Sequence, residues 1–201
     1  MLGGVFNPPH LGHLICAGEA HAQLGLDLVL LVPVGDAPHR KIDQEPGAEV
    51  RARLCDYAVA GDRRLALSRI EIDRSGPSYS VDTLRLLRER APEDELTVIL
   101  GADQATRLPG WREPETVLSL AKVAVAARQG VDREAVLGHL DGLAGSEKIV
   151  FFDIPRIDIS SSLVRERAGS DRPIRYLVPD KVADYVQSQR LYGASMPVSA
   201  E

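Results

Sequence analysis

Residues 3–13 of the chain read Gly3-Gly4-Val5-Phe6-Asn7-Pro8-Pro9-His10-Leu11-Gly12-His13, and an apolar helical pattern follows them. Two adjacent glycines let the backbone turn sharply and approach another molecule closely, because they carry no Cβ. Pro8 and Pro9 disfavour a helix before them, so we expect the helix to begin near His10. His10 and His13 then lie one turn apart on the same face. The stretch thus predicts a strand, a tight loop and a helix that begins at the loop.

The remainder of the chain alternates short apolar runs with longer helical patterns. Strands are expected at 28–34, 65–73, 96–100, 123–127 and 149–154, the second of them an edge strand because its apolar residues alternate with polar ones. Helices are expected near 12–24, 48–60, 80–91, 113–121, 132–144 and 180–190, with start signals at Ser80, Pro114 and Asp132. This alternation predicts an α/β fold with a doubly wound parallel sheet, whose ligands bind beyond the carboxyl ends of the strands.

Length and charge limit the organisation and the partners of the chain. Its 201 residues are enough for one domain, expected over residues 1–193 with a small helical part at about 160–193 and a loose tail at 194–201. Only Met1 and Leu2 precede Gly3, so the first strand is expected to be unusually short or to lack its first residues. The formal net charge of -5 argues against a general nucleic-acid binder, whose surface would be basic.

Two further features concern the compartment. No apolar run reaches the ~18–20 residues that a membrane span needs, and the N-terminus has no secretory signal pattern. Cys16 and Cys55 lie in amphipathic helical patterns, where free buried thiols are the expected state. We therefore expect a cytoplasmic protein with no membrane partner, while the sequence leaves open whether it forms a homo-oligomer.

The segment from Gly3 to His13 has the chemistry of a phosphate site. A helix N-terminus offers unpaired N–H groups and a positive dipole end, worth ~0.3–1 kcal/mol to a nearby anion. Each imidazole of His10 and His13 can add a hydrogen-bond donor. A turn with solvent-facing histidines, or a His-x-x-His metal pair, are the alternatives, and neither explains the whole ordered string. The two established glycine-rich phosphate fingerprints, G-x-x-x-x-G-K-[ST] and G-x-G-x-x-G, are absent from the sequence.

A second anion site is predicted near the other end, at Asp158-Ile159-Ser160-Ser161-Ser162-Leu163-Val164-Arg165. It follows an expected strand and opens a helix, for which Ser160 is a suitable N-cap. Arg165 lies about one turn into this helix, where its guanidinium could bind phosphate oxygens. Simple helix capping with an exposed arginine is the alternative. Two anion-binding helix starts, each placed after a strand, favour one crevice that holds a polyphosphate.

The two segments together resemble the nucleotidyltransferase superfamily that has a His-x-Gly-His motif and a distal Ile-Ser-Ser-[Thr/Ser]-x-x-Arg motif. Over nearly the whole chain the sequence is similar to bacterial nicotinate-nucleotide adenylyltransferases. Further matches are Pro38-His39-Arg40-Lys41 after an expected strand, Pro77-Ser78-Tyr79-Ser80-Val81-Asp82-Thr83-Leu84, Gly101-Ala102-Asp103, Trp111, and the ending from Tyr176 to Tyr192. Departures are modest, with Asn7 where many members have Asp, and Ser80 and Ser162 where Thr is usual.

This resemblance implies a Rossmann-like nucleotidyltransferase fold and a reaction in which ATP and nicotinate mononucleotide give nicotinate adenine dinucleotide and pyrophosphate, within NAD biosynthesis. The nucleophile is an anionic phosphate oxygen, so neither a general base nor a covalent intermediate is required. The catalytic residues implied are His10, His13 and Arg165. The ATP-binding residues implied are Gly4, Val5, Phe6, Gly12, Gly101, Asp103, Ser160, Ser161 and Ser162. Mg²⁺ is expected to be bound mainly through the ATP phosphates, with no metal site built by the protein.

The middle of the chain is implied to bind the acceptor, nicotinate mononucleotide. His39, Arg40 and Lys41 form the densest cluster of cations and suit its phosphate, although such runs are commonly solvated loops. The residues expected around the nicotinate ring are Tyr79, Ser80, Thr83 and Trp111. Trp111 is the only tryptophan and is expected on a loop, where an indole can stack on a pyridine.

Four alternatives share part of this pattern. Phosphopantetheine adenylyltransferases have both phosphate motifs but lack the Pro-Ser-Tyr and tryptophan-loop features, and a preference for nicotinamide mononucleotide depends on a single carboxylate of the acceptor. A class I aminoacyl-tRNA synthetase fragment would need a longer chain and a Lys-Met-Ser-Lys-Ser loop. A non-catalytic nucleotide sensor would bind ATP without turnover.

Overall fold

The computed structural model describes residues 1–37, 42, 44, 46–128 and 130–194. Its centre is one six-stranded sheet in which every pair of neighbours is parallel, in the order β3-β2-β1-β4-β5-β6. The strands are β1 (Leu2–Gly4), β2 (Val29–Pro33), β3 (Leu65–Leu67), β4 (Thr97–Gly101), β5 (Lys122–Arg128) and β6 (Val150–Ile154). The chain reverses its winding between β1 and β4, so the predicted doubly wound parallel sheet is confirmed, and the crevice at this point is where such folds bind ligands.

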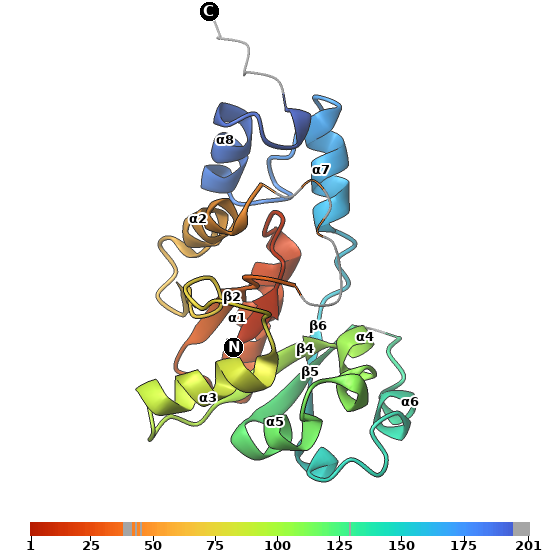
Figure 1. The fold of residues 1–201 in the computed structure, drawn as a ribbon. Helices are drawn as coiled ribbons and strands as arrows, with labels where there is room; N and C mark the ends of the chain where they lie inside the picture. The colour runs from red at the N-terminus through yellow and green to blue at the C-terminus, as the bar shows by residue number, and fades with distance from the viewer. Residues whose placement is uncertain (38–41, 43, 45, 129, 195–201) are drawn as a thin grey trace, which may run out of the picture.

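Helices cover both faces of the sheet (Figure 1). The described α-helices are α1 (Leu11–Leu24), α2 (Ala48–Val59), α3 (Ser80–Arg90), α4 (Ala102–Ala105), α5 (Pro114–Leu120), α6 (Arg133–Gly138), α7 (Ser161–Gly169) and α8 (Asp180–Ser188). Three single turns of 3-10 helix, η1 (Leu108–Gly110), η2 (Ser146–Lys148) and η3 (Leu191–Gly193), complete the elements.

The strands β4 and β5 show how the sequence builds two cores. Side chains alternate across a strand, and both faces of these strands are buried. Val98 and Leu100 of β4 pack in the cluster under α3 and α5, whereas Ile99 between them packs in the cluster under α1 and α2. In β5, Val123 and Val125 likewise pack in the cluster under α3 and α5, and Ala124 packs in the cluster under α1 and α2. The continuous apolar runs of the sequence are therefore strands covered by helices on both sides.

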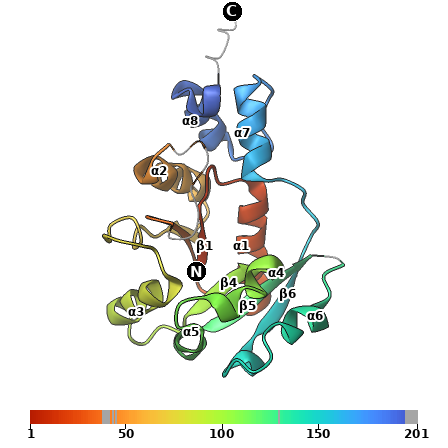
Figure 2. The same ribbon diagram turned by 45° about the vertical axis from the view of Figure 1, so that its right-hand side comes forward.

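A third apolar cluster joins the C-terminal helices to α2. Leu54 and Ala58 of α2 pack with Val164 of α7 and with Val182 and Val186 of α8. Figure 2 shows α7 and α8 together at one end of the molecule, with α2 beside α8 and with α7 at the end of α1. The C-terminal helices thus cover the start of α1, where the first predicted phosphate site lies.

Some predicted boundaries are wrong for local reasons. The expected strand at 65–73 ends at Leu67, because the chain turns at Arg69, whose carbonyl accepts the N–H groups of Ile72 and Asp73; its position at the sheet edge is confirmed. The helix expected at 132–144 ends at Gly138, and Gly142 and Gly145 follow with positive φ. Ser80 is the first residue of α3 rather than its cap.

Other boundaries agree with the sequence. Pro114 begins α5, and the Asp132 side chain accepts the Ala135 N–H at the start of α6. The first strand is present over three residues and pairs with both β2 and β4. Ala194, predicted to begin the tail, is buried, while residues 195–201 lie outside the described part. Among the described residues, no helix is long and apolar enough to span a membrane.

Truncation of Leu54 tests the contribution of the third cluster to stability. Leu54 is fully buried between α2 and the C-terminal helices. We expect Leu54→Ala to lower the free energy of unfolding by ~2–5 kcal/mol, because it removes apolar contacts and leaves a cavity. Urea denaturation followed by circular dichroism measures this change. The control Leu28→Ala, at a half-exposed leucine, should change it by no more than ~0.5 kcal/mol; equal effects would contradict the packing described.

Candidate functional site

The loop after β1 is shaped by close contacts between its own residues. Phe6 has a φ of 51° and is buried, and a Cβ on Gly4 would lie 3.1 Å from its ring. The Phe6 ring meets the edge of the His13 ring at a centroid distance of 4.9 Å. A Cβ on Gly12 would lie 3.1 Å from the His10 ring, so glycine at this position leaves room for that imidazole.

The two histidines are stacked at the start of α1, as the sequence predicted from their spacing. Their ring centroids are 3.7 Å apart, and the backbone N–H of His10 donates to the His13 Nδ1 over 3.1 Å. With Nδ1 as an acceptor, His13 in its neutral form carries its proton on Nε2. The Nδ1 of His10 is buried and has no hydrogen-bond partner within the described residues. A buried polar atom of this kind is a candidate to bind a ligand.

Both histidines resist protonation in the ligand-free state. Burial, with a smaller contribution from the positive charge of Arg128, lowers the pKa of His10 from 6.5 to about 4. Burial and the neighbouring His10 lower the pKa of His13 from 6.5 to about 3. Both imidazoles are therefore neutral hydrogen-bonding groups at neutral pH.

Arg128 is a charged residue near His10 that the sequence analysis did not single out. It ends β5 at the carboxyl edge of the sheet, is exposed, and is close enough to His10 to lower its pKa. The signal was available, because the carboxyl ends of parallel strands meet at one edge and a lone arginine ends this apolar strand. The residues predicted from the sequence follow the first four strands or begin the distal helix, and none of them follows β5.

The second predicted anion segment lies against the first. The Ser161 hydroxyl donates to the Pro8 carbonyl over 2.8 Å, and Arg165 donates to the Asn7 carbonyl over 2.9 Å and to the Ser162 hydroxyl over 3.3 Å. Ser160 caps α7 by accepting the Leu163 N–H, as predicted. The predicted convergence of the two segments is confirmed, and it places an arginine and several hydroxyls beside the histidines.

Three further contacts fix the loop after β1. The Tyr192 hydroxyl donates to the Asn7 side-chain oxygen over 2.7 Å. The buried Arg51 donates to the carbonyls of Val5, Val34 and Gly35, which ties the ends of β1 and β2 together. The Leu11 N–H donates to the Leu177 carbonyl, so one N–H group that the sequence analysis expected to be free at this helix start is already used.

The residues predicted for the adenosine side follow β4. Gly101 ends the strand in an extended conformation, and Asp103 is exposed within the short helix α4. Asp103 is the second residue of that helix and not its N-cap. The structure thus places its carboxylate at the carboxyl end of β4, beside β1 in the sheet.

The residues predicted around the nicotinate ring have different environments. Tyr79 and Trp111 are half-buried and pack against the same core cluster, and the guanidinium of Arg112 lies 4.9 Å from the centroid of the Tyr79 ring. Ser80, also half-buried, begins α3. Thr83 is fully buried, and its hydroxyl donates to Glu71 over 2.7 Å. His39, Arg40 and Lys41 lie outside the described residues.

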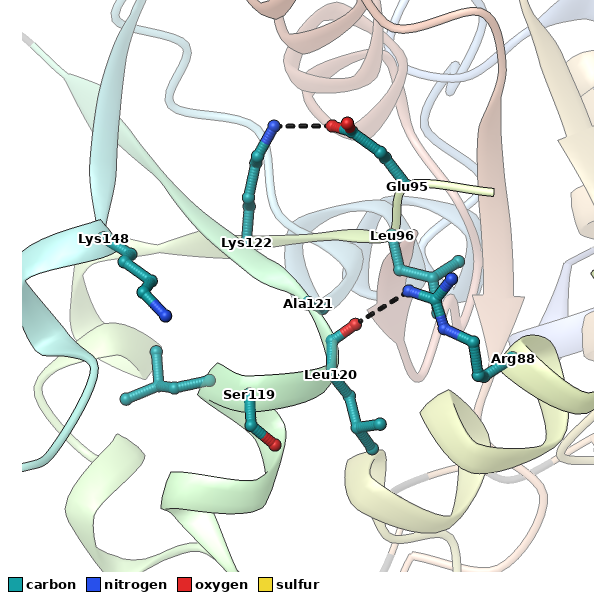
Figure 3. Close-up of a pocket in the computed structure, with 9 residues that line it drawn as sticks. Arg88, Glu95, Leu96, Ser119, Leu120, Ala121, Lys122 and Lys148 are labelled. Carbon is teal, nitrogen blue, oxygen red and sulfur yellow. Dashed lines mark hydrogen bonds and ion pairs between the residues drawn. The ribbon is translucent and has the colours of Figure 1, made fainter. Parts of the chain in front are cut away.

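A separate hollow of about 190 Å³ lies at the opposite edge of the sheet (Figure 3). It is lined by residues at the amino ends of β4 and β5, among them Leu96 and Lys122. Figure 3 shows Lys122 paired with Glu95, and Arg88 donating to the Leu120 carbonyl. These cations already have partners, and ligands of parallel sheets bind at the carboxyl ends. The candidate site is therefore the crevice around the loop after β1.

Comparisons with known proteins agree with this geometry. Residues 1–167 match the family described as cytidylyltransferase-like. A probable nicotinate-nucleotide adenylyltransferase from Corynebacterium kroppenstedtii is 40% identical over 201 residues, covering 100% of this chain and 93% of the relative. The nicotinate-nucleotide adenylyltransferase of Bacillus subtilis is 35% identical over 192 residues, covering 96% of each chain.

A solved structure shares the fold at low sequence identity. The nicotinic acid mononucleotide adenylyltransferase of Plasmodium falciparum, complexed with NaAD, has a TM-score of 0.78 and 17% sequence identity, and the match covers 96% of each chain. The sheet and the site therefore define a cytidylyltransferase-like nucleotidyltransferase. Within that class, the chain belongs to the nicotinate-nucleotide adenylyltransferase family, as its sequence resemblance implied.

The lowered pKa values of the histidines predict how stability depends on pH. Below about pH 6.5 the unfolded chain takes up protons at His10 and His13, while the folded chain stays neutral there until about pH 4 and about pH 3. The free energy of unfolding is thus unaffected by these two groups above about pH 6.5, and it decreases as the pH falls below that value. We expect His13→Gln to lose less Tm than the unsubstituted protein between about pH 7 and pH 5.

Thermal unfolding at a series of pH values measures this difference. His139→Gln is the matched control, because His139 is exposed on the surface. It should keep the pH dependence of the unsubstituted protein. Identical curves for the His13 variant and the unsubstituted protein would show that the folded protein does not hold His13 neutral.

Proposed function

We propose that this protein transfers the adenylyl group of ATP to nicotinate mononucleotide by direct in-line attack, forming nicotinate adenine dinucleotide and pyrophosphate. The observation that carries the proposal is the meeting of the two phosphate segments, in which Ser161 and Arg165 hydrogen-bond to the loop that leads to His10 and His13. Full-length relatives bear this activity in their names. The attacking phosphate oxygen is already anionic, so the protein supplies alignment and charge stabilisation.

The ATP phosphates are assigned to the groups around the loop after β1. The neutral imidazoles of His10 and His13 donate hydrogen bonds to phosphate oxygens, and Arg165 with Ser161 and Ser162 binds the β- and γ-phosphates. Arg128, whose charge already acts on His10, adds a second positive charge near the imidazole pair. These groups stabilise the negative charge that builds on the leaving pyrophosphate.

The adenosine and acceptor sides are assigned to neighbouring strand ends. The Asp103 carboxylate accepts hydrogen bonds from the ribose hydroxyls, next to the Gly101 backbone. Tyr79, Ser80 and Trp111 surround the nicotinate ring, and the His39, Arg40 and Lys41 cluster binds the acceptor phosphate. Thr83 is proposed to support the acceptor site from within the core, because its side chain is buried.

Mg²⁺ is proposed as the cofactor of this reaction. The described residues contain no group of three or more His, Cys, Asp or Glu side chains that could hold a metal ion. In nucleotide sites Mg²⁺ usually keeps several waters and is held mainly by substrate phosphates, so the proposal requires no such group. A bound Mg²⁺ would neutralise part of the negative charge of the ATP phosphates.

An acceptor-specificity assay tests the proposed function. Pyrophosphate release is measured with ATP, Mg²⁺ and one of three acceptors: nicotinate mononucleotide, nicotinamide mononucleotide or phosphopantetheine. We expect the highest kcat/KM with nicotinate mononucleotide. Equal or better turnover of phosphopantetheine would overturn the assignment, and binding of ATP without turnover of any acceptor would identify a nucleotide sensor.

Substitution of His13 tests its assigned role. We expect His13→Ala to lower kcat by about 100- to 1,000-fold and to weaken ATP binding less, because the imidazole acts most strongly on charge that develops in the transition state. Steady-state kinetics and ATP titration separate these effects. His139→Ala, at an exposed histidine on α6's C-terminal side, is the control and should retain full turnover. Unchanged kcat in the His13 variant would remove this residue from the mechanism.

A further inference from the structure

Glu71 is a buried carboxyl group to which the proposed reaction assigns no role. It lies in the turn after β3 and is 7% exposed. The Thr83 hydroxyl donates to it over 2.7 Å. Burial raises the pKa of Glu71, and the nearby hydroxyls of Thr83 and Ser78 partly offset this rise. A buried carboxylate is costly unless it is hydrogen-bonded, and these two hydroxyls stabilise its charged form.

The two hydroxyl donors lie on either side of the predicted acceptor residues. Ser78 directly precedes Tyr79 and Ser80, and Thr83 lies one turn of α3 after Tyr79, to whose carbonyl its backbone N–H donates. Glu71 therefore hydrogen-bonds to the chain after the Tyr79–Ser80 pair and lies beside the Ser78 hydroxyl before it. Movement of that pair would require breaking at least one of these contacts.

The same carboxyl group reaches the end of β2 through Ser78. The Gly35 N–H donates to the Ser78 hydroxyl over 3.0 Å, and the Ser78 N–H donates to the Asp36 carbonyl over 2.8 Å. A Cβ on Gly35 would lie 2.2 Å from the Glu71 carbonyl oxygen, so the two backbones approach each other as closely as glycine permits. The segment after β2 and the start of α3 are thus joined over Glu71.

The geometry points to Glu71 as a positioning residue of the acceptor site, which sets the place of Tyr79 and Ser80 through Ser78 and Thr83. This inference rests on the proposed function, because it assumes that Tyr79 and Ser80 contact nicotinate mononucleotide. Glu71 acts on the acceptor alone. The ATP phosphates are held by the loop after β1, to which neither Ser78 nor Thr83 makes a described hydrogen bond.

The test compares Glu71→Gln, Ser78→Ala and the double variant with the unsubstituted protein. Each single substitution removes one charge or one donor and keeps the volume nearly unchanged. We expect each to raise the KM for nicotinate mononucleotide about tenfold and to leave the KM for ATP within about twofold, because only acceptor binding loses its preorganised segment. The KM of the double variant for nicotinate mononucleotide should not exceed that of the more impaired single variant, because both substitutions disturb one network.

Two measurements separate positioning from a general effect on stability. Thermal unfolding records the Tm of each variant, and quenching of the fluorescence of Trp111, the only tryptophan, records acceptor binding without turnover. Glu95→Gln is the matched control, because Glu95 is exposed and pairs with Lys122 at the opposite edge of the sheet. It should keep both KM values.

Equal rises in the two KM values, or a lowered Tm with an unchanged acceptor KM, would overturn the positioning role. Failure of the proposed function is seen separately, in the unsubstituted protein, as absent turnover of nicotinate mononucleotide. In that case the fluorescence titration is made with the acceptor that the unsubstituted protein does use. Unweakened binding of that acceptor by Glu71→Gln also overturns the inference, and weakened binding supports it.

Discussion

The carbonyl groups of the loop after β1 need hydrogen-bond donors, and this need organises much of the molecule. Once the chain leaves the sheet at Gly4, its buried carbonyls lose the partners that neighbouring strands supply. Arg51 of α2 donates to Val5, Arg165 of α7 donates to Asn7, and Ser161 donates to Pro8. Donors from two distant helices therefore close over one short loop. These hydrogen bonds act together with the apolar cluster on α2 to hold the C-terminal helices against the loop.

Much of the fold follows from periodicity in the sequence. The apolar runs around Leu31, Ile99 and Val125 are buried strands, and their alternation with helical patterns predicts a parallel sheet. Boundaries were less predictable, because they depend on local turns. Arg69 ends the third strand with backbone hydrogen bonds that have no apolar signature. The short helix α4 and the 3-10 turns are too brief for any periodicity to mark them.

The site was predictable to the extent that its residues are close in sequence. His10, Gly12 and His13 form one motif, and Ser160 with Arg165 forms another. Arg128 and Glu71 come instead from segments that carry no motif, and only the folded sheet brings them to the crevice and the acceptor segment. Thr83 was placed beside the substrate because of its motif, but the direction of its side chain is set by the carboxyl group beneath it. Spacing along the chain does not reveal that the Thr83 side chain points into the core, toward Glu71.

The use of the Leu11 N–H by the Leu177 carbonyl has a consequence for how this molecule recognises an anion. The start of α1 keeps fewer free backbone donors than an isolated helix would have, so recognition depends more on side chains. Those side chains come from the start of α1 (Leu11–Leu24), from β5 (Lys122–Arg128) and from α7 (Ser161–Gly169), which lie far apart along the chain. No excised peptide would reproduce the arrangement. A nucleotide bound here would stabilise the folded state, because the side chains that contact it come together only in the complete fold.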